Sequence, residues 1–130
     1  MKKLISSKNI KLKGKIQKND NSYYWPRLNS DIDGLINWNW EARYIVSFIK
    51  GFSNPFNGAF SRIGKLKVKF FDASFHVSKI KFHPFQNGII FRLSQKNIYV
   101  AACNYYIKIP TKQIKLQIKN KEFLLGKRFN

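Results

Sequence analysis

The side chains that could carry out acid–base or metal chemistry are few in this sequence and lie far apart. His76 and His83 are the two histidines, and Asp72 is the one acidic residue between Glu41 and Glu122. General acid–base catalysis and metal binding both need several such groups at one site, and the sequence has no zinc-ligand spacing, phosphate-binding glycine loop or Ser/His/Asp set. It therefore predicts no catalytic residue and no metal site. We expect the two histidines to be structural and Asp72 to form a turn.

The sequence also offers little for disulfide formation or for membrane insertion. The single cysteine, Cys103, continues the short apolar run 100–102, which predicts a small core residue. One cysteine cannot form an internal disulfide, and this suits a reducing compartment. The chain has no apolar run of the ~20 residues that a membrane span needs, and its first residues lack a signal core. We therefore expect a cytoplasmic protein without a membrane partner.

Positive charge is the strongest compositional feature. The chain has 25 Lys and Arg against 6 Asp and Glu, a formal net charge of +19, and such a field attracts nucleic acid or anionic metabolites. We call Arg62, Lys65, Lys67 and Lys69 the basic row, because the three lysines alternate with apolar residues at intervals of roughly 6.5 to 7 Å along a predicted strand. That spacing predicts a site for nucleic acid or an anionic small-molecule substrate. The alternative is a solvated outer face whose lysines block edge pairing.

One helix and a series of strands must position these side chains. Apolar residues recur at three- and four-residue spacing over residues 39–51, which predicts an amphipathic helix with Asn39 as its N-cap. After residue 58 the period changes to two. Strands are predicted at 59–62, 66–70, 75–82, 88–93, 97–102, 105–109 and 113–118, with a bulge near residues 78–79. This succession predicts one mainly β domain, either a small closed barrel or a sandwich.

Residues 1–34 have a different character and are predicted to be a connecting segment. Tyr23, Tyr24 and Trp25 stand directly before Pro26, which favours an extended backbone. Three adjacent aromatic residues need a surface to cover, and if nothing covers them they form an apolar patch of the kind that marks an interface. We predict that these three residues dock to a partner.

Two short motifs flank the predicted helix. The first is Asp33-Gly34-Leu35-Ile36-Asn37-Trp38 and the second is Pro55-Phe56-Asn57-Gly58-Ala59-Phe60. Together they resemble the start of the C-terminal domain of the formyltransferase family, which includes methionyl-tRNA formyltransferase and the sugar N-formyltransferases. Asn37 stands where the family commonly has aspartate, and Asn57 where it commonly has proline. The linker element Tyr23-Tyr24-Trp25-Pro26-Arg27 and the closing run Leu124-Leu125-Gly126-Lys127-Arg128 are similar to the family as well.

The resemblance implies a small OB-like antiparallel β-barrel, preceded by an extended linker and one α-helix. It divides the chain into a linker-like segment at 1–34, similar to the end of a catalytic domain, and an OB-type domain at 35–130. In the family, a preceding domain binds 10-formyltetrahydrofolate and transfers the formyl group to an amine. None of that domain's catalytic residues has a counterpart here, so the cofactor is expected in a catalytic domain absent from this chain.

Two functions follow as expectations. The first is a non-catalytic accessory or substrate-holding domain, which docks to a formyltransferase catalytic domain in a separate chain or to a second copy of itself. The second is a stand-alone RNA- or tRNA-binding OB-like domain that uses the basic row. The tRNA enzymes of the family hold RNA with this domain, whereas in the sugar enzymes it often supports dimer contacts. The residues leave open both the acceptor substrate and the number of subunits.

Overall fold

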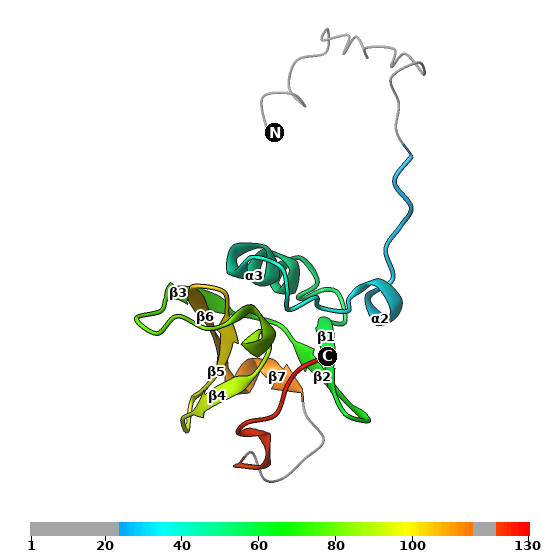
Figure 1. Cartoon of the computed structure of the whole chain (residues 1–130). Helices are drawn as coiled ribbons and strands as arrows, with labels where there is room; N and C mark the ends of the chain where they lie inside the picture. The colour runs from blue at the N-terminus through cyan, green and yellow to red at the C-terminus, as the bar shows by residue number, and fades with distance from the viewer. Residues whose placement is uncertain (1–23, 116–121) are drawn as a thin grey trace, which may run out of the picture.

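The computed structural model of the chain describes residues 24–115 and 122–130 (Figure 1). Its elements are helices α2 (Ser30–Asp33) and α3 (Ala42–Gly51), strands β1 (Ala59–Ile63), β2 (Leu66–Phe70), β3 (Ser74–Val77), β4 (Ile90–Leu93), β5 (Asn97–Ala102), β6 (Tyr105–Pro110) and β7 (Ile114–Lys115), and the 3-10 turns η2 (Pro84–Gln86), η3 (Thr111–Gln113) and η4 (Glu122–Leu124). The predicted mainly β class with one long helix is confirmed for this part of the chain.

The strands pair into two antiparallel sheets, in the orders β1-β2-β7 and β3-β6-β5-β4. The predicted alternation is clear in β2, where Val68 and Phe70 are buried, while Lys67 before them is exposed and Lys69 between them is half-buried. Pairing among the described strands does not run around one closed barrel. Two antiparallel sheets are therefore what the structure supports, and the barrel expected from the resemblance is not confirmed.

The chain crosses between the sheets in two places. β2 continues into β3, and β6 continues through η3 into β7, so one antiparallel pair passes from the four-stranded sheet into the three-stranded sheet. At the other edges, C-terminal residues bridge the sheets. Ile89 pairs with Arg128, and Arg62 exchanges backbone hydrogen bonds of 2.9 and 2.8 Å with Asn130. The last residues thereby tie β1 to the start of β4.

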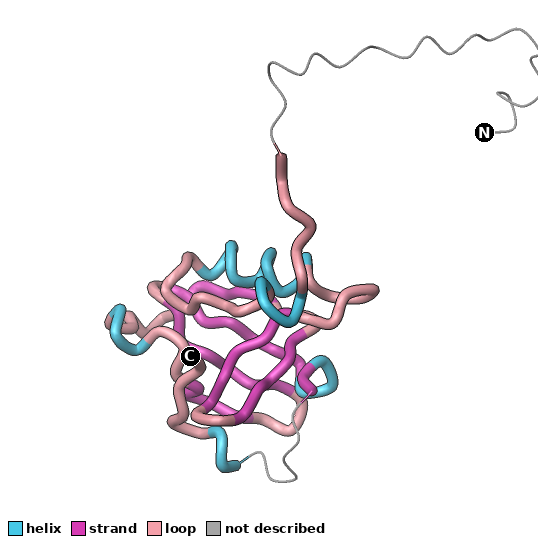
Figure 2. The backbone as a smooth tube through the Cα atoms, turned by 90° about the vertical axis from the view of Figure 1, so that its right-hand side faces the viewer, coloured by secondary structure: helices cyan, strands magenta, loops and turns pink. Residues whose placement is uncertain are grey.

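Helix α3 covers one end of the core. Its buried residues are Ala42, Ile45, Val46 and Ile49, and the helix packs against β1, β3 and β6. Figure 2 shows it lying over the strands, with residues 24–29 leading away from the domain. Because burying an aliphatic side chain contributes about 1.5 to 3 kcal/mol, this apolar stripe holds the helix in place.

The start of α3 differs from the prediction. The helix begins at Ala42, and Glu41 occupies the cap position without a side-chain hydrogen bond. Asn39, the predicted N-cap, instead donates its backbone N–H to the side-chain oxygen of Asn37 at 3.0 Å. This side-chain turn satisfies the backbone before the helix begins, so Asn39 does not cap it.

The strand predicted at 75–82 is shorter than expected, because β3 ends at Val77. The backbone N–H of Ser78 donates to Asn104 at 3.2 Å, and the Ser78 hydroxyl accepts from Ile80 at 3.1 Å. This local turn diverts the chain from the sheet. The bulge predicted near 78–79 is therefore wrong, and the register shift lies in β4, between Ile90 and Arg92.

Cys103 is exposed and is not the core residue that the sequence predicted. Ala102 pairs with Tyr105 at the end of the β5–β6 hairpin, which leaves Cys103 and Asn104 as a two-residue turn. Asn104 has a φ of 58°, the left-handed conformation that such tight turns require and that asparagine tolerates. The apolar run 100–102 ends at this turn, so Cys103 leaves the core.

Parts of two predictions fall outside the described residues. Strand β7 (Ile114–Lys115) corresponds to the start of the strand predicted at 113–118, and residues 116–118 are not described. Tyr23 of the predicted docking element also lies outside the described ranges. Across 24–115 and 122–130, the helices are all too short or too polar to pass through a membrane.

Candidate functional site

The basic row lies on the β1–β2 hairpin. Arg62 of β1 pairs with Lys67 of β2, and the side chains of directly paired residues share one face of a sheet. Lys69 lies two residues further along β2 and therefore on the same face. Lys65 falls in the turn that joins the two strands. The structure thus gathers three members of the row on one outer face and leaves the fourth at the hairpin tip.

An acidic side chain already occupies the centre of this row. The Asp31 carboxylate, from α2, accepts hydrogen bonds from both Lys67 and Lys69, each at 3.3 Å. Helix α2 holds Asp31 in place because the side-chain oxygen of Asn29 caps its backbone N–H at 3.0 Å. Two of the four cations in the row are therefore partly neutralised within the chain, which lowers the attraction of this face for an external anion.

The same contacts perturb the acid. Hydrogen bonds from Lys69 and then Lys67, together with their charges, lower the pKa of the Asp31 carboxyl from its ordinary value. A lowered pKa in the folded state means that these ion pairs stabilise the fold above the unfolded pKa and are lost as the pH falls through the folded pKa. Asp31 is exposed, so solvent screens this contribution.

An aromatic ring also lies beneath the row. The Lys67 ammonium is 4.1 Å from the centroid of the buried Phe60 ring, within the range of a cation–π contact. Lys67 therefore has two partners inside the chain, Asp31 and Phe60. Arg62 and Lys65 are the exposed members of the row for which the described residues offer no carboxylate within salt-bridge distance.

The predicted docking element is exposed where the structure describes it. Tyr24 is 89% and Trp25 83% exposed, on the extended segment that leads away from the domain (Figure 1). Both aromatic side chains are therefore available to a partner.

Next to this segment lies an apolar groove of about 280 Å³. Its walls are Leu28, from the segment itself, and Phe48, Gly51, Phe52 and Phe56, from α3 and the turn after it. Leu28 is 61% and Phe56 54% exposed. Tyr24 and Trp25 precede Leu28 on the same segment, and exposed apolar side chains of this kind are usual at interaction sites.

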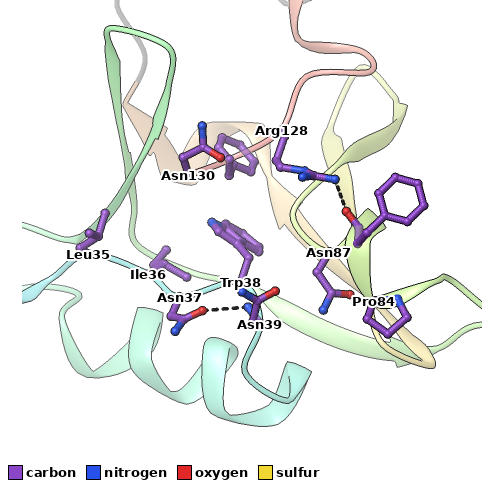
Figure 3. Close-up of a pocket in the computed structure, with 11 residues that line it drawn as sticks. Leu35, Ile36, Asn37, Trp38, Asn39, Pro84, Asn87, Arg128 and Asn130 are labelled. Carbon is purple, nitrogen blue, oxygen red and sulfur yellow. Dashed lines mark hydrogen bonds between the residues drawn. The ribbon is translucent and has the colours of Figure 1, made fainter.

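A second cavity, of about 400 Å³, shares no lining residue with the groove (Figure 3). It is bordered by the segment 35–39, by η2 with Asn87, and by the C-terminal residues 128–130. Arg128 crosses its rim and donates a hydrogen bond to the carbonyl oxygen of Phe85. In the sequence Asn37, Trp38 and Arg128 are family markers, and no local signal predicts that they meet, because 89 or more residues separate their two segments along the chain.

Trp38 anchors the wall of this cavity. Its indole N–H donates to the hydroxyl of Ser61 at 2.9 Å, and that hydroxyl donates to the Asn130 carbonyl oxygen at 2.9 Å. The indole stacks on Phe129 with ring centroids 5.0 Å apart, and it meets the edge of Phe70 at 6.1 Å. The start of the domain, β1 and the C-terminal residues are thus held together through one side chain.

The two histidines and Asp72 make structural contacts. His83 accepts the backbone N–H of Phe85 at its Nδ1 and so caps η2. The His76 ring lies within hydrogen-bond distance, 3.1 Å, of the Ser74 hydroxyl. Asp72 accepts the backbone N–H of Ala73 at 2.9 Å, as a turn-forming aspartate does.

Comparison with known protein families gives a match over most of the chain. The family described as formyl transferase, C-terminal domain, matches residues 30–128 of the 130-residue chain. The match begins at the first residue of α2, includes both motifs that flank α3, and ends at Arg128, the first residue of the C-terminal wall of the cavity. No curated protein matches the chain.

Proposed function

Because the chain belongs to the formyl transferase C-terminal domain family, we propose that it is a non-catalytic accessory domain of a formyltransferase. It docks to a catalytic domain, or holds that domain's substrate, while the catalytic domain transfers a formyl group from 10-formyltetrahydrofolate to an amine. The family match confirms the resemblance seen in the two motifs around α3, and the accessory role builds on it. We expect this function in the cytoplasm.

Two groups of exposed side chains, those of residues 24–28 and those that line the groove beside α3, carry the docking part of the proposal; we call them together the aromatic surface beside α3. Tyr24, Trp25, Leu28 and Phe56 are each more than half exposed, although large apolar side chains are normally covered. Aromatic residues are also enriched among those that dominate binding energies at interfaces. A partner domain that covers this surface would remove it from water, and we propose the catalytic domain as that partner.

The test uses a formyltransferase catalytic domain from the same cell, mixed with this chain and followed by size-exclusion chromatography and calorimetry. We expect co-elution, and we expect the double variant Tyr24→Ser with Trp25→Ser to weaken the complex about thirty-fold or more, because it removes two aromatic anchors. Ile80→Ser is the matched control, since Ile80 is 63% exposed and lies outside the aromatic surface. Absence of a complex, or an equal effect in the control, would contradict the proposal.

We also infer an OB-like relationship between the two sheets. On one side, the chain runs from β2 into β3 and from β6 into β7, and β2 pairs with β7 while β3 pairs with β6, which supports the OB-like relationship. The backbone contacts of Arg128 and Asn130 with Ile89 and Arg62 support it on the other. Strands that bend from one sheet into the next are how small barrels turn their corners.

A second candidate function is RNA binding by the basic row, favoured by the outward position of Arg62 and Lys65 on the hairpin. Lys67 and Lys69 would contribute fully only when released from Asp31. In this interpretation tRNA is the substrate that the domain holds. Asp31 then acts as an internal competitor for the phosphate groups.

Asp31→Asn should therefore tighten tRNA binding and make its dependence on salt steeper by about one to two units on a log–log plot, because two lysines become available to phosphates. Glu41→Gln is the matched control: it changes the net charge equally, but Glu41 pairs with Arg43, away from the row. Fluorescence anisotropy with labelled tRNA across a salt series measures both. Equal gains in the two variants would show a response to net charge alone and would count against the basic row.

A further inference from the structure

The outer face of the four-stranded sheet carries a cluster of aromatic rings that the functions above do not use. Tyr106 of β6 pairs with His76 of β3, and Tyr99 of β5 pairs with Arg92 of β4 and with Lys108 of β6. Their strand neighbours Val100, Ile107 and Ile109 are buried in the core, so these side chains point to the opposite, outer face. We call this surface the tyrosine face; its members are His76, Phe82, Phe91, Arg92, Tyr99, Tyr106 and Lys108. Phe82 follows β3 and joins the face through Phe91, with ring centroids 5.0 Å apart.

The rings of the tyrosine face form one connected group. His76 stacks on Tyr106 with centroids 5.3 Å apart and planes 21° apart, and Tyr106 is 5.8 Å from Tyr99. Phe91 lies 6.4 Å from Tyr99 and 6.2 Å from Tyr106. Phe91 is the residue at the register shift of β4, and a bulge of this kind can turn a side chain onto the other face of a sheet. Phe91, Tyr99 and Tyr106 are half-buried and His76 is exposed, so the four strands present a connected group of partly exposed rings.

The charge of the tyrosine face is positive, and within 24–115 and 122–130 no carboxylate lies within salt-bridge distance of Arg92 or Lys108. The Arg92 guanidinium is 5.1 Å from the Tyr99 ring centroid, and Lys108 is the cross-strand neighbour of Tyr99. The sequence contains no aspartate or glutamate between Asp72 and Glu122, so β3, β4, β5 and β6 contribute no acid to this face. It differs in this from the basic row, where Asp31 holds two of the lysines.

We propose that the tyrosine face binds single-stranded nucleic acid, with unpaired bases stacking on Tyr99 and Tyr106 and phosphates lying next to Arg92 and Lys108. Stacking of a base on an aromatic side chain contributes about 1 to 3 kcal/mol, and cations beside the rings neutralise the backbone. A duplex hides its base faces and can use only the charges. An acidic peptide likewise lacks the planar groups that the rings accept.

The tyrosine face shares no residue with the aromatic surface beside α3 or with the basic row. An experiment that contradicts either proposed function therefore does not contradict nucleic-acid binding by the tyrosine face. Likewise, an experiment that contradicts this binding does not contradict either proposed function. The face also predicts which kind of nucleic acid binds. Contacts through base faces and phosphates do not require a 2′-hydroxyl, so RNA and DNA single strands of one sequence should bind alike.

The test measures fluorescence anisotropy with labelled RNA and DNA single strands of about 12 nucleotides, and with the matching duplex. We expect the single strands to bind about tenfold or more tighter than the duplex, and Tyr99→Ala and Tyr106→Ala each to weaken them about tenfold. Arg92→Gln should lower the log–log salt slope by about one unit, because one phosphate is no longer neutralised. Tyr99→Phe and Tyr106→Phe should keep the affinity, because a phenylalanine ring still stacks.

Phe85→Ala is the matched control, since Phe85 is 64% exposed, borders the second cavity and is not a member of the tyrosine face. Circular dichroism of each variant distinguishes weaker binding by a folded domain from unfolding, and the Tyr→Phe pair keeps the test valid if an alanine variant unfolds. Equal affinity for single strand and duplex would overturn the proposal. So would displacement of the single strand by polyglutamate of equal charge, or a larger effect of Phe85→Ala than of Tyr99→Ala.

Discussion

Trp38→Ala should lower the free energy of unfolding by about 3 to 5 kcal/mol, the cost typical of removing a large aromatic residue from a core. Trp38 is 5% exposed and contacts the rings of Phe70 and Phe129. Its removal would leave a cavity at the point where the first strand and the C-terminal residues meet. Urea denaturation followed by far-ultraviolet circular dichroism measures the change without relying on tryptophan fluorescence.

Two further variants separate the causes of this destabilisation. Trp38→Phe keeps an aromatic ring but removes the indole N–H that donates to Ser61, and a missing hydrogen bond at a buried hydroxyl costs about 1 to 3 kcal/mol. Trp25→Ala is the control at a position that is 83% exposed, where about 0.5 kcal/mol or less is expected. If Trp38→Ala cost no more than Trp25→Ala, Trp38 would not be the anchor described above.

Gly88→Ala should destabilise the fold by about 2 to 4 kcal/mol, the sum of a left-handed backbone penalty and of overpacking. Gly88 has a φ of +83°, and a Cβ there would lie 3.0 Å from the Phe129 carbonyl oxygen and 3.2 Å from the Trp38 side chain. Its own N–H and C=O bond Ala101 and Phe129, so the backbone has little freedom to move away. Denaturant midpoints compared at constant m-value give the change.

Two other glycines isolate the causes combined in this prediction. Gly64 has a φ of +58° but open space where a Cβ would lie, so Gly64→Ala should show the backbone penalty alone, about 1 to 2 kcal/mol. Gly51 has open space at the end of α3 and no positive φ, so Gly51→Ala should be neutral or stabilise by up to about 1 kcal/mol. If Gly88→Ala lowered the free energy of unfolding no more than Gly64→Ala, Trp38 and Phe129 would have moved to make room for the Cβ. That result would contradict the prediction that these two residues are held rigidly in place.

The spacing of apolar residues along the sequence was enough to predict the elements that bury one face. The three- and four-residue spacing of Ala42, Ile45 and Ile49 located α3, and the alternation around Val68 located β2, because burial on one face imposes those periods. Errors arose where side-chain hydrogen bonds overrode the pattern. The Ser78 hydroxyl ended β3 early, and the tight turn at Asn104 carried Cys103 out to solvent.

The candidate sites were harder to predict, because they depend on contacts between distant residues. Spacing alone placed Lys67 and Lys69 on one face, but nothing local indicated that Asp31, 36 and 38 residues away, binds both. The exposure of Tyr24 and Trp25 was predicted as a condition, namely that nothing in the chain covers them. Within the part of the chain that the structure describes, Tyr24 and Trp25 are 89% and 83% exposed, so nothing there covers them.

By itself the sequence determined the family, the mainly β class, the order of helix and strands, and the large positive charge, since each follows from residue type and short-range spacing. The tertiary structure alone decided which charges are compensated and where the aromatic rings gather. Strand register brings His76, Phe91, Tyr99 and Tyr106 onto one face from four strands. That register is set by pairing between segments far apart in the chain, and a shift of one residue would turn every one of these rings to the other side of the sheet.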